Sequence, residues 1–327
     1  MMKRIFALAL GALLLPLSVP AHAQQPRKVP RIGYLIGTSS SSNVARTEAF
    51  RQGLRESGYV EGKNILIESR FTEGKLDRER ALAAELVGMK VDVIVTGGSI
   101  TTRAAKEATT TIPIVMTQDP DPIGNGFVAS LARPDGNVTG LSNLGPELSG
   151  KRLELLKEVV PRITRVAVFG SSTFVGNAQI LRETELAANA LKVQLQYVDV
   201  PDQKDIETAF RAARRGAVHA VHVLAGGVFT SRRPQLAALA VASRLPAIYY
   251  ATEFVEDGGL MTYGANRTDL ARRAATYVDK ILKGAKPAEL PIEQPTKFEF
   301  VINLRAAKQI GLTIPPNVLA RADRVIR

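Results

Sequence analysis

The chain has 327 residues, of which 45% are hydrophobic, and it carries a formal net charge of +12 with no cysteine. This length suits two domains that each bury a core, and the lack of cysteine excludes disulfides and thiol chemistry. The basic residues are scattered among acids without a dense tract, which favours a solvated basic surface over a nucleic-acid-binding face.

The first residues have the three-part pattern of a secretory signal peptide. Lys3 and Arg4 precede the apolar stretch 5–19, and a small-residue cleavage pattern ends at Ala23. A membrane anchor is the alternative, but the stretch is shorter than the roughly 20 apolar residues that span a bilayer. We expect a signal peptide over 1–23, cleavage near Ala23 and a periplasmic mature protein.

Short β-branched runs alternate with longer segments of helical period, which predicts parallel sheets with crossover helices. We expect strands near 31–37, 64–70, 91–96, 113–117 and 137–141, with helices near 44–57, 77–89, 99–110, 122–132 and 148–159. We then expect strands near 165–170, 193–199, 217–224, 246–250 and 259–263, with helices near 177–191, 203–214, 231–243 and 267–283. After a connector at 284–291 come a strand near 298–302 and helices near 304–309 and 317–325.

Landmarks of the first half recur about 120 to 135 residues later in the same order. The matched segments are 31–40 with 165–173, 91–99 with 218–227, 112–116 with 245–250, and 136–140 with 258–262. Two similar lobes explain the repeat, and two lobes make a cleft. The tail belongs to neither repeat, so we expect it to cross between the lobes as the third hinge segment.

Several segments carry a resemblance to a known family. They are 53–64, 112–115, 121–124, 130–134, 136–140, 287–292, 303–308 and 311–315. Together they resemble the ABC transporter substrate-binding proteins of the type I periplasmic-binding-protein fold, whose known members include tryptophan- and phenylalanine-binding proteins. The resemblance implies an α/β protein with two Rossmann-like lobes, parallel sheets and a three-segment hinge. It also implies a receptor, not an enzyme, that closes on a small ligand and delivers it to an ABC permease with its ATPase.

The domain division follows from the repeat and the hinge. We expect an N-terminal lobe at 30–143 plus about 265–290, and a C-terminal lobe at 144–264 plus about 296–327. Contact with the membrane is expected only through the permease, and the protein is expected to be a monomer that binds no nucleic acid.

Ligands of open α/β sheets bind beyond the carboxyl ends of the strands, where helix N-termini present unpaired N–H groups. The predicted ligand-binding residues at these positions are Thr38, Ser39, Gly98, Ser99, Gln118, Asp119, Ser142 and Asn143 in the first lobe and Ser172, Thr173, Gly226, Gly227, Thr252 and Glu253 in the second. Gly98-Ser99 would let a carboxylate approach backbone N–H groups. Ordinary turn and cap chemistry is the favoured explanation for any single one of these positions, whereas Gly98-Ser99, Thr38 and Ser142 together favour a binding site in a family of receptors.

Charged and aromatic residues indicate the kind of ligand. Asp119 and Glu253 are candidates to receive an ammonium group, and a helix cap or a salt bridge is an equal alternative for each. Phe229 and Tyr250 are the preferred aromatic wall, while the alternation along 247–250 puts at least one of Tyr249 and Tyr250 in the core. The pattern favours an amino acid or related zwitterion, and an aromatic or branched side chain is favoured but not required.

Motifs for catalysis are missing from the sequence. It contains no His-Glu-x-x-His, Gly-x-Ser-x-Gly or Walker A pattern, and His219 and His222 fall within an apolar strand pattern. We therefore expect no metal, no cofactor and no catalytic site. Two alternatives stay open: a receptor that presents its ligand to a sensor kinase or chemoreceptor, and an α/β enzyme with Asp119 or Glu253 as general base.

Overall fold

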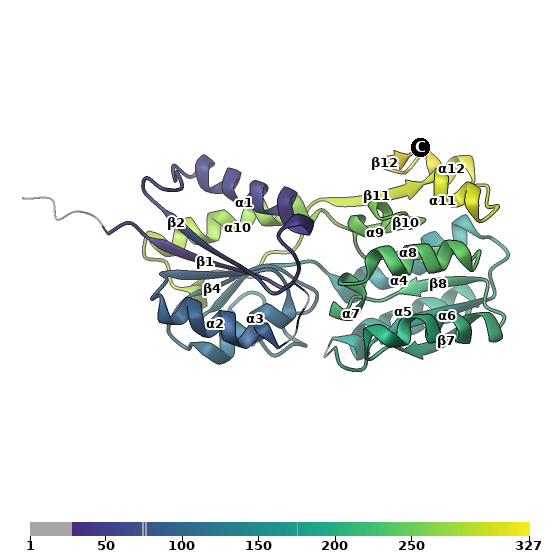
Figure 1. Cartoon of the computed structure of the whole chain (residues 1–327), viewed down its shortest axis with the longest axis horizontal. Helices are drawn as coiled ribbons and strands as arrows, with labels where there is room; N and C mark the ends of the chain where they lie inside the picture. The colour runs from purple at the N-terminus through teal and green to yellow at the C-terminus, as the bar shows by residue number, and fades with distance from the viewer. Residues whose placement is uncertain (1–27, 74, 76, 175) are drawn as a thin grey trace, which may run out of the picture.

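The computed structural model describes residues 28–327 except 74, 76 and 175, so the predicted signal peptide lies outside the described residues. Two α/β lobes lie side by side along the long axis of the molecule (Figure 1). One is built on a five-stranded sheet of order β2-β1-β3-β4-β5 and the other on a seven-stranded sheet of order β12-β11-β10-β9-β8-β6-β7. The predicted α/β architecture with two largely parallel sheets is confirmed.

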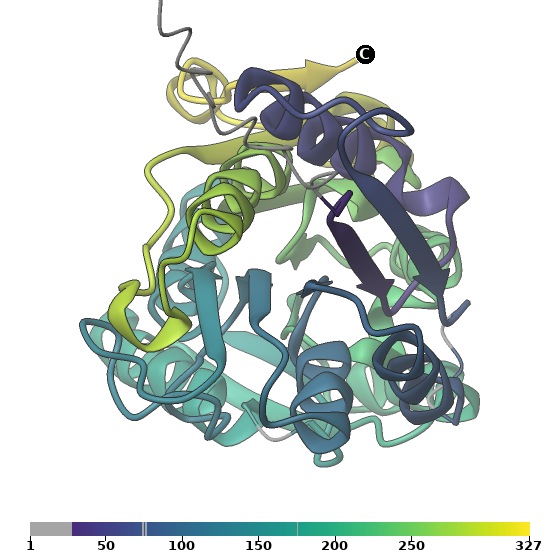
Figure 2. The same cartoon turned by 90° about the vertical axis from the view of Figure 1, so that its left-hand side faces the viewer.

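The first lobe has helices on both faces of an all-parallel sheet. Its strands are β1 (Arg31–Ile36), β2 (Leu66–Phe71), β3 (Val93–Thr96), β4 (Ile114–Asp119) and β5 (Val138–Ser142). A short 3-10 turn, η1 (Ser41–Asn43), leads into α1 (Val44–Glu56), which covers one face together with α10 (Arg267–Leu282). The other face carries α2 (Arg78–Gly88) and α3 (Ser99–Ala108), as the end-on view of Figure 2 shows. Burial on both faces explains why β3 and β4 read as continuous apolar runs.

The second lobe repeats this scheme and adds two strands at one edge. Its strands are β6 (Arg165–Gly170), β7 (Gln194–Asp199), β8 (Ala220–Val223), β9 (Ala247–Tyr249), β10 (Met261–Ala265), β11 (Phe298–Asn303) and β12 (Arg324–Ile326). β11 runs antiparallel to β10, and β12 runs parallel to β11. One face carries α4 (Gly145–Val159), α5 (Asn177–Leu191), α11 (Leu304–Gln309) and α12 (Pro316–Leu319). The other carries η2 (Gln203–Asp205), α6 (Ile206–Arg215), α7 (Gly227–Thr230), α8 (Arg233–Ala242) and α9 (Thr252–Glu256).

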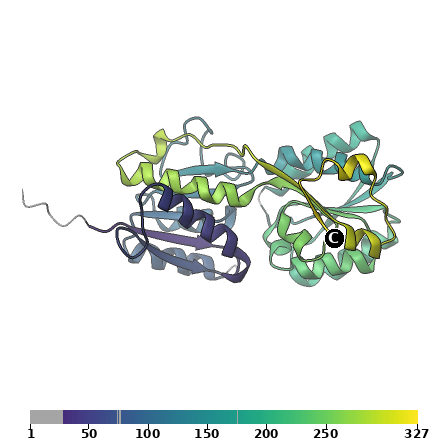
Figure 3. The same cartoon turned by 90° about the horizontal axis from the view of Figure 1, so that it is seen from above.

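Three segments of chain cross between the lobes. They join β5 to α4, β10 to α10, and η3 (Pro287–Glu289) to β11; Figure 3 shows the last of them running between the lobes toward β11. The crossings are tied to each other and to the first sheet by backbone hydrogen bonds, from Ser142 N to Glu293 O at 2.9 Å and from Asn266 N to Lys297 O at 2.9 Å. Within the part of the chain that the structure describes, no helix has both the length and the apolar character needed to cross a bilayer.

Two predicted helices are wrong. The segment 122–132 forms turns, because Gly124 and Gly126 disfavour a helix and Gly126 adopts a φ of +70°. In the tail, the helix expected at 317–325 ends at Leu319, and the last residues pair with β11 as strand β12. Each of the other predicted elements has a counterpart whose ends differ by a few residues at most.

Candidate functional site

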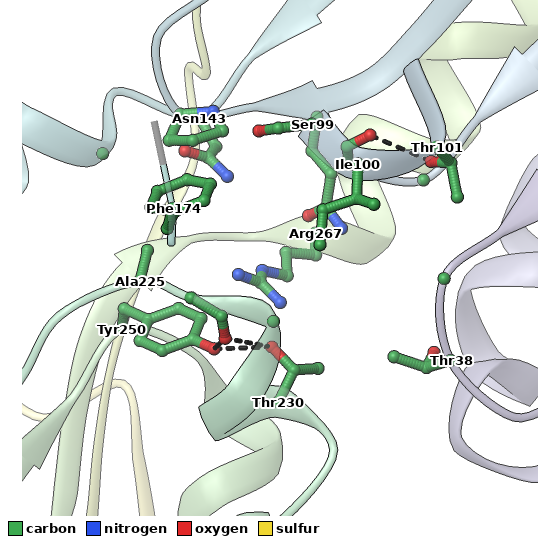
Figure 4. A pocket seen from close by; sticks show the side chains of 18 of the residues that line it. Thr38, Ser99, Ile100, Thr101, Asn143, Phe174, Ala225, Thr230, Tyr250 and Arg267 are labelled. Carbon is green, nitrogen blue, oxygen red and sulfur yellow. Dashed lines mark hydrogen bonds between the residues drawn. The ribbon is translucent and has the colours of Figure 1, made fainter. Parts of the chain in front are cut away.

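A cavity of about 140 Å³ lies between the lobes. It sits beyond the carboxyl ends of strands from both sheets, the place where open α/β folds bind ligands. Its volume is close to the roughly 150 Å³ of an engineered apolar cavity that admits benzene. The space therefore suits one small molecule with a ring or a branched chain (Figure 4).

The first lobe contributes residues that follow its strands. Thr38 follows β1, Gln118 lies at the end of β4, and Asn143 follows β5. Gly98 has a φ of +140°, a conformation that favours glycine, and it turns the chain from β3 into α3. Ser99 is consequently the first residue of that helix and lines the cavity.

The second lobe contributes a loop and a short helix after β8 and one tyrosine after β9. Gly226 and Gly227 begin α7 and line the cavity. The Tyr250 hydroxyl lies 2.6 Å from Thr230 Oγ1 and donates to Gly226 O at 3.1 Å, which holds the ring at the wall (Figure 4). Tyr249 is fully buried in the core, so of these two tyrosines Tyr250 is the one that faces the cavity.

The two lobes touch across the cavity. A Cβ atom added to Gly227 of the second lobe would lie 2.9 Å from Ile100 Cδ1 of the first. Arg46 of α1 and Glu253 of α9, which belong to different lobes, form an ion pair at 3.2 Å. The structure is therefore a closed arrangement of the lobes.

Arg46 and Arg267 line one side of the cavity and pair with Glu253, a predicted ligand-binding residue that does not itself line the cavity. We call these three residues the arginine–glutamate cluster. Glu253 lies 3.2 Å from Arg46 and 4.0 Å from Arg267. Burial alone would raise the pKa of Glu253, but the attraction of the two arginines outweighs it and lowers this pKa to about 2. Arg267 also lies over the ring of Tyr250, 5.4 Å from its centroid. The carboxylate is thus neutralised within the protein.

Arg152 of α4 also lines the cavity but, unlike the arginines of the cluster, has no carboxylate beside it within the described part of the chain. The residue is only 3% exposed, and its Nε donates to Tyr263 O at 2.7 Å. No carboxylate of the described residues lies within ion-pair distance of it. Burial, and then repulsion by Arg267, lowers the pKa of Arg152 to about 9, so it remains a cation at neutral pH. A buried cation of this kind requires an anionic partner.

Glu79 of α2 is the counterpart of opposite sign. It is 4% exposed and lines both the cavity and a wider cleft of about 770 Å³ that adjoins it. Burial, with a smaller contribution from Asp77, raises the pKa of Glu79 to about 7. The described residues provide it with neither a salt bridge nor a side-chain hydrogen bond.

The structure brings half of the predicted ligand-binding residues to the cavity. These are Thr38, Gly98, Ser99, Gln118, Asn143, Gly226, Gly227 and Tyr250. Their common property is a position within a few residues of a strand's carboxyl end.

Other predicted residues of the first lobe lie beside the cavity and not at it. Asp119 is fully buried and accepts hydrogen bonds from Asn125 Nδ2 at 2.9 Å and from Asp121 N at 3.0 Å. Ser142 is buried in the hinge, where its Oγ accepts from Leu144 N. Ser39 bonds to the serines of η1. Ser39, Ser142 and Oδ1 of Asp119 thus take part in local turn or hinge hydrogen bonds, while Oδ2 of Asp119 is buried without a hydrogen-bond partner among the described residues.

In the second lobe the outcome is similar. Ser172 bonds to Asp199 through both its N–H and its hydroxyl, and Thr173 lines the wider cleft. Thr252 donates to Glu299 at 3.1 Å, on the far side of the arginine–glutamate cluster. Phe229 is fully buried because the apolar face of α7 packs into the core, so it is not the expected wall residue.

The sequence prediction missed several residues that line the cavity, among them its charged side chains and one aromatic: Arg46, Glu79, Arg152, Phe174 and Arg267. The four charged ones lie on helices, whereas the prediction considered loops after strands. Their signal was a charge at a helix position that continues the apolar stripe. Phe174 follows β6 just after the Ser171-Ser172-Thr173 segment, so the criterion that selected Phe229, an aromatic residue past a strand end, would also have selected Phe174.

Neither His219 nor His222 lines the cavity. His222 is fully buried, and burial together with nearby Arg152 lowers its pKa to about 3, so it is neutral. His219 bonds to the start of β6. Among residues 28–327, with the three undescribed positions set aside, no group of three or more potential metal ligands is present.

The fold, the hinge and the interlobe cavity define a two-lobed solute-binding protein of the type I periplasmic-binding-protein class. The family model for the ABC transporter substrate binding protein matches residues 34–326. The chain therefore belongs to this family, and the predicted resemblance is confirmed. Members of this class are receptors that serve ABC transporters outside the cytoplasm, a non-enzyme role.

Known relatives agree over most of the chain. The tyrosine-binding protein of Clostridioides difficile (strain R20291) is 26% identical over 268 residues, which cover 81% of this chain and 76% of the relative. A crystal structure of a conserved domain protein from Vibrio cholerae is 29% identical with a TM-score of 0.85, covering 91% of this chain and 100% of the other. The ABC domain from Streptococcus pneumonia in complex with L-Trp is 28% identical with a TM-score of 0.85, covering 91% and 99%.

Proposed function

We propose that this protein is the extracytoplasmic receptor of an ABC importer for a free amino acid, with an aromatic side chain as the favoured ligand. The observation that carries the proposal is Arg152, a buried cation at the interlobe cavity without a carboxylate partner among the described residues. A ligand carboxylate would supply that partner. Two relatives support an aromatic ligand, since one is named for tyrosine and the other was solved with L-Trp.

The lining of the cavity supports the same ligand class. Phe174, Ile100 and Ala225 provide apolar surface, while Thr38 lies across the cavity from Phe174 (Figure 4). Arg267 occupies one face of the Tyr250 ring, so Phe174 is the aromatic side chain that we propose to contact a ligand ring. The volume of about 140 Å³ leaves room for one such ring.

The proposal extends to the ligand contacts, the lobe boundaries, the location and the oligomeric state of the protein. The eight predicted residues that line the cavity remain proposed ligand contacts. We propose lobes at 30–143 plus about 265–290 and at 144–264 plus about 296–327, which is supported by α10 packing on the first sheet and β11 joining the second. We further propose a periplasmic monomer, released by cleavage near Ala23, that delivers its ligand to a permease and performs no turnover.

Isothermal titration calorimetry of ligand-stripped protein against L-tyrosine, L-tryptophan, L-phenylalanine and L-leucine tests this function. We expect the aromatic amino acids to bind and to be recovered unchanged. Arg152→Met keeps the side-chain volume and removes the charge, so it should weaken binding by at least about 30-fold, as loss of a buried charge pair costs roughly 2–5 kcal/mol.

The matched control is Arg211→Met on the exposed side of α6, which should bind like the unchanged protein. Failure of every amino acid to bind would refute the ligand class. Normal binding by the Arg152 variant would refute the assignment of the carboxylate.

A further inference from the structure

Glu79 lies where the cavity meets the wider cleft. It is the second residue of α2, and its side chain lies on the same helix stripe as the fully buried Ala83 and Leu86. A carboxyl at this position is a local exception, because the stripe otherwise packs in the core of the first lobe. The residue lines both spaces and is 4% exposed.

Among the described residues, the carboxyl of Glu79 has neither an ion-pair nor a side-chain hydrogen-bond partner. The cavity and the wider cleft are lined by charged residues from several elements: Asp77 just before α2, Arg80 from α2, Arg103 and Glu107 from α3, Asp202 from the second lobe, and Arg46, Arg152 and Arg267 at the cavity. Among the described residues none of these cations pairs with Glu79, whereas Arg80 pairs with Glu107 at 3.2 Å. A buried, unpaired carboxylate calls for a cationic group from elsewhere.

Neither of the two acids predicted to receive an ammonium group lines the cavity. Asp119 is buried beside the cavity, where its Oδ1 accepts from Asn125 and from the Asp121 backbone, and Glu253 is paired with Arg46 and Arg267. Glu79 is the acid that lines the cavity and remains open.

We propose that Glu79 determines specificity by receiving the ammonium group of the ligand, opposite the carboxylate that Arg152 receives. This inference rests on the proposed function, because it requires a ligand with both groups. An unpaired cation and an unpaired anion at one cavity select a zwitterion and fix its orientation. A ligand that lacks the amino group would leave Glu79 buried without a partner.

The proposal has a consequence for protons. In a complex with a ligand that lacks an amino group, burial keeps the pKa of Glu79 near 7, so at pH 7 roughly half of the carboxyl groups carry a proton. In a complex with an amino acid, the ammonium group favours the ionised carboxyl and the proton stays in the solvent. The two complexes therefore differ by roughly half a proton at pH 7, whatever the state of the free protein.

Calorimetry at pH 7 in phosphate and in Tris buffer measures this difference, because the two buffers have different ionisation enthalpies. The probes are L-tyrosine and 3-(4-hydroxyphenyl)propanoic acid, which differ in the amino group. With the unchanged protein we expect the acid to bind at least about 10-fold more weakly and to take up roughly half a proton more than L-tyrosine. The preference for L-tyrosine should also grow as the pH rises from 5.5 to 8.

Glu79→Gln should remove both effects. The variant should lose most of its preference for L-tyrosine, and its proton uptake should be the same for both probes. Glu107→Gln is the control, since Glu107 lines the wider cleft but not the cavity. Circular dichroism verifies that the variants are folded, and the two-probe comparison on the unchanged protein stands even if Glu79→Gln does not fold.

Equal proton uptake for the two probes in the unchanged protein would overturn the role of Glu79, as would a Glu79→Gln protein that discriminates normally. In those cases binding that still depends on Arg152 would leave the proposed function intact. If no amino acid binds at all, both proposals fail together.

Discussion

The arginine–glutamate cluster and the pair Arg152 and Glu79 lie at the same cavity, but their charges are compensated in different ways. Glu253 is neutralised by two arginines of the other lobe, so this cluster forms when the lobes close. Arg152 and Glu79 have no ion-pair partner within the described protein, although both are buried. The difference teaches that the cluster contributes to closure, while the open pair contributes to ligand recognition.

Removing the carboxylate of the cluster should have the largest effect. With Glu253→Gln, closure would bury Arg46 and Arg267 without compensation, and breaking a buried ion pair costs roughly 3–5 kcal/mol. Ligand affinity should fall by about 100-fold or more although Glu253 is not a proposed ligand contact. Folding stability of the free protein should change little, because opening exposes both arginines.

Calorimetry and urea unfolding measure the two quantities separately. Glu256→Gln, on the same helix but exposed, is the control. An affinity within threefold of the unchanged protein would show that the cluster does not govern closure.

A bulky side chain at the contact between the lobes should prevent closure and so separate the charges of both groups. Gly227→Phe places a ring where Ile100 now lies and keeps the lobes apart, at a cost of about 1–3 kcal/mol or about 5- to 150-fold in affinity. Small-angle scattering should then show an open form even with ligand. Gly88→Phe, at a position with open space around it, should bind and close normally. Ile100→Ala combined with Gly227→Phe should recover part of the affinity; no recovery would contradict the contact.

The carboxyls of Glu253 and Glu79 should affect the stability of the closed form in opposite ways as the pH changes. The pKa of Glu253 is lowered to about 2, so its contribution to the closed form is complete above about 4.5 and is lost as the pH falls toward 2. The pKa of Glu79 is raised to about 7, so its ionisation destabilises the closed form as the pH rises from about 4.5 through 7, by at most about 1.4 kcal/mol per pH unit. Carbon NMR of labelled glutamates reports both midpoints. Two midpoints near the ordinary value for glutamate would remove the contrast between the groups.

Tyr250→Phe should have the smallest effect. It removes the hydrogen bonds to Thr230 and Gly226 but keeps the ring beneath Arg267, so the cost is about 1 kcal/mol or a few-fold in affinity. Thermal unfolding measures the loss of stability, and calorimetry measures the loss of affinity. Tyr197→Phe, which also removes hydroxyl hydrogen bonds but does not line the cavity, is the matched control. Complete loss of binding in Tyr250→Phe would mean that the hydroxyl contacts the ligand directly.

Most of the fold could be predicted because it follows from local patterns. Buried parallel strands read as short β-branched runs, and proline or glycine ends most of the helices between them. The segment 122–132 failed because an apolar spacing suggested a helix while Gly124 and Gly126 favoured turns. The tail failed at 324–326 because a three-residue strand depends on its pairing with β11, which local sequence does not encode.

The site was half predictable for a related reason. Loop residues after strands could be placed from topology alone, which found Thr38, Gly98, Ser99 and Tyr250. The charged residues lie on helices, and the prediction assigned basic helix residues to the surface. Arg152, for example, continues the buried stripe of Leu148, Leu155 and Val159 on α4. A charge on such a stripe indicates a functional position. Only the arrangement of the two lobes in space shows which of these charges lack an ion-pair partner.

A crystal structure of the complex with L-tyrosine tests the central claim most directly. The account predicts closed lobes, with the ligand carboxylate on Arg152, the ring beside Phe174 and the ammonium group toward Glu79. A ligand with its ammonium group at Arg152, or one bound outside the interlobe cavity, would contradict it.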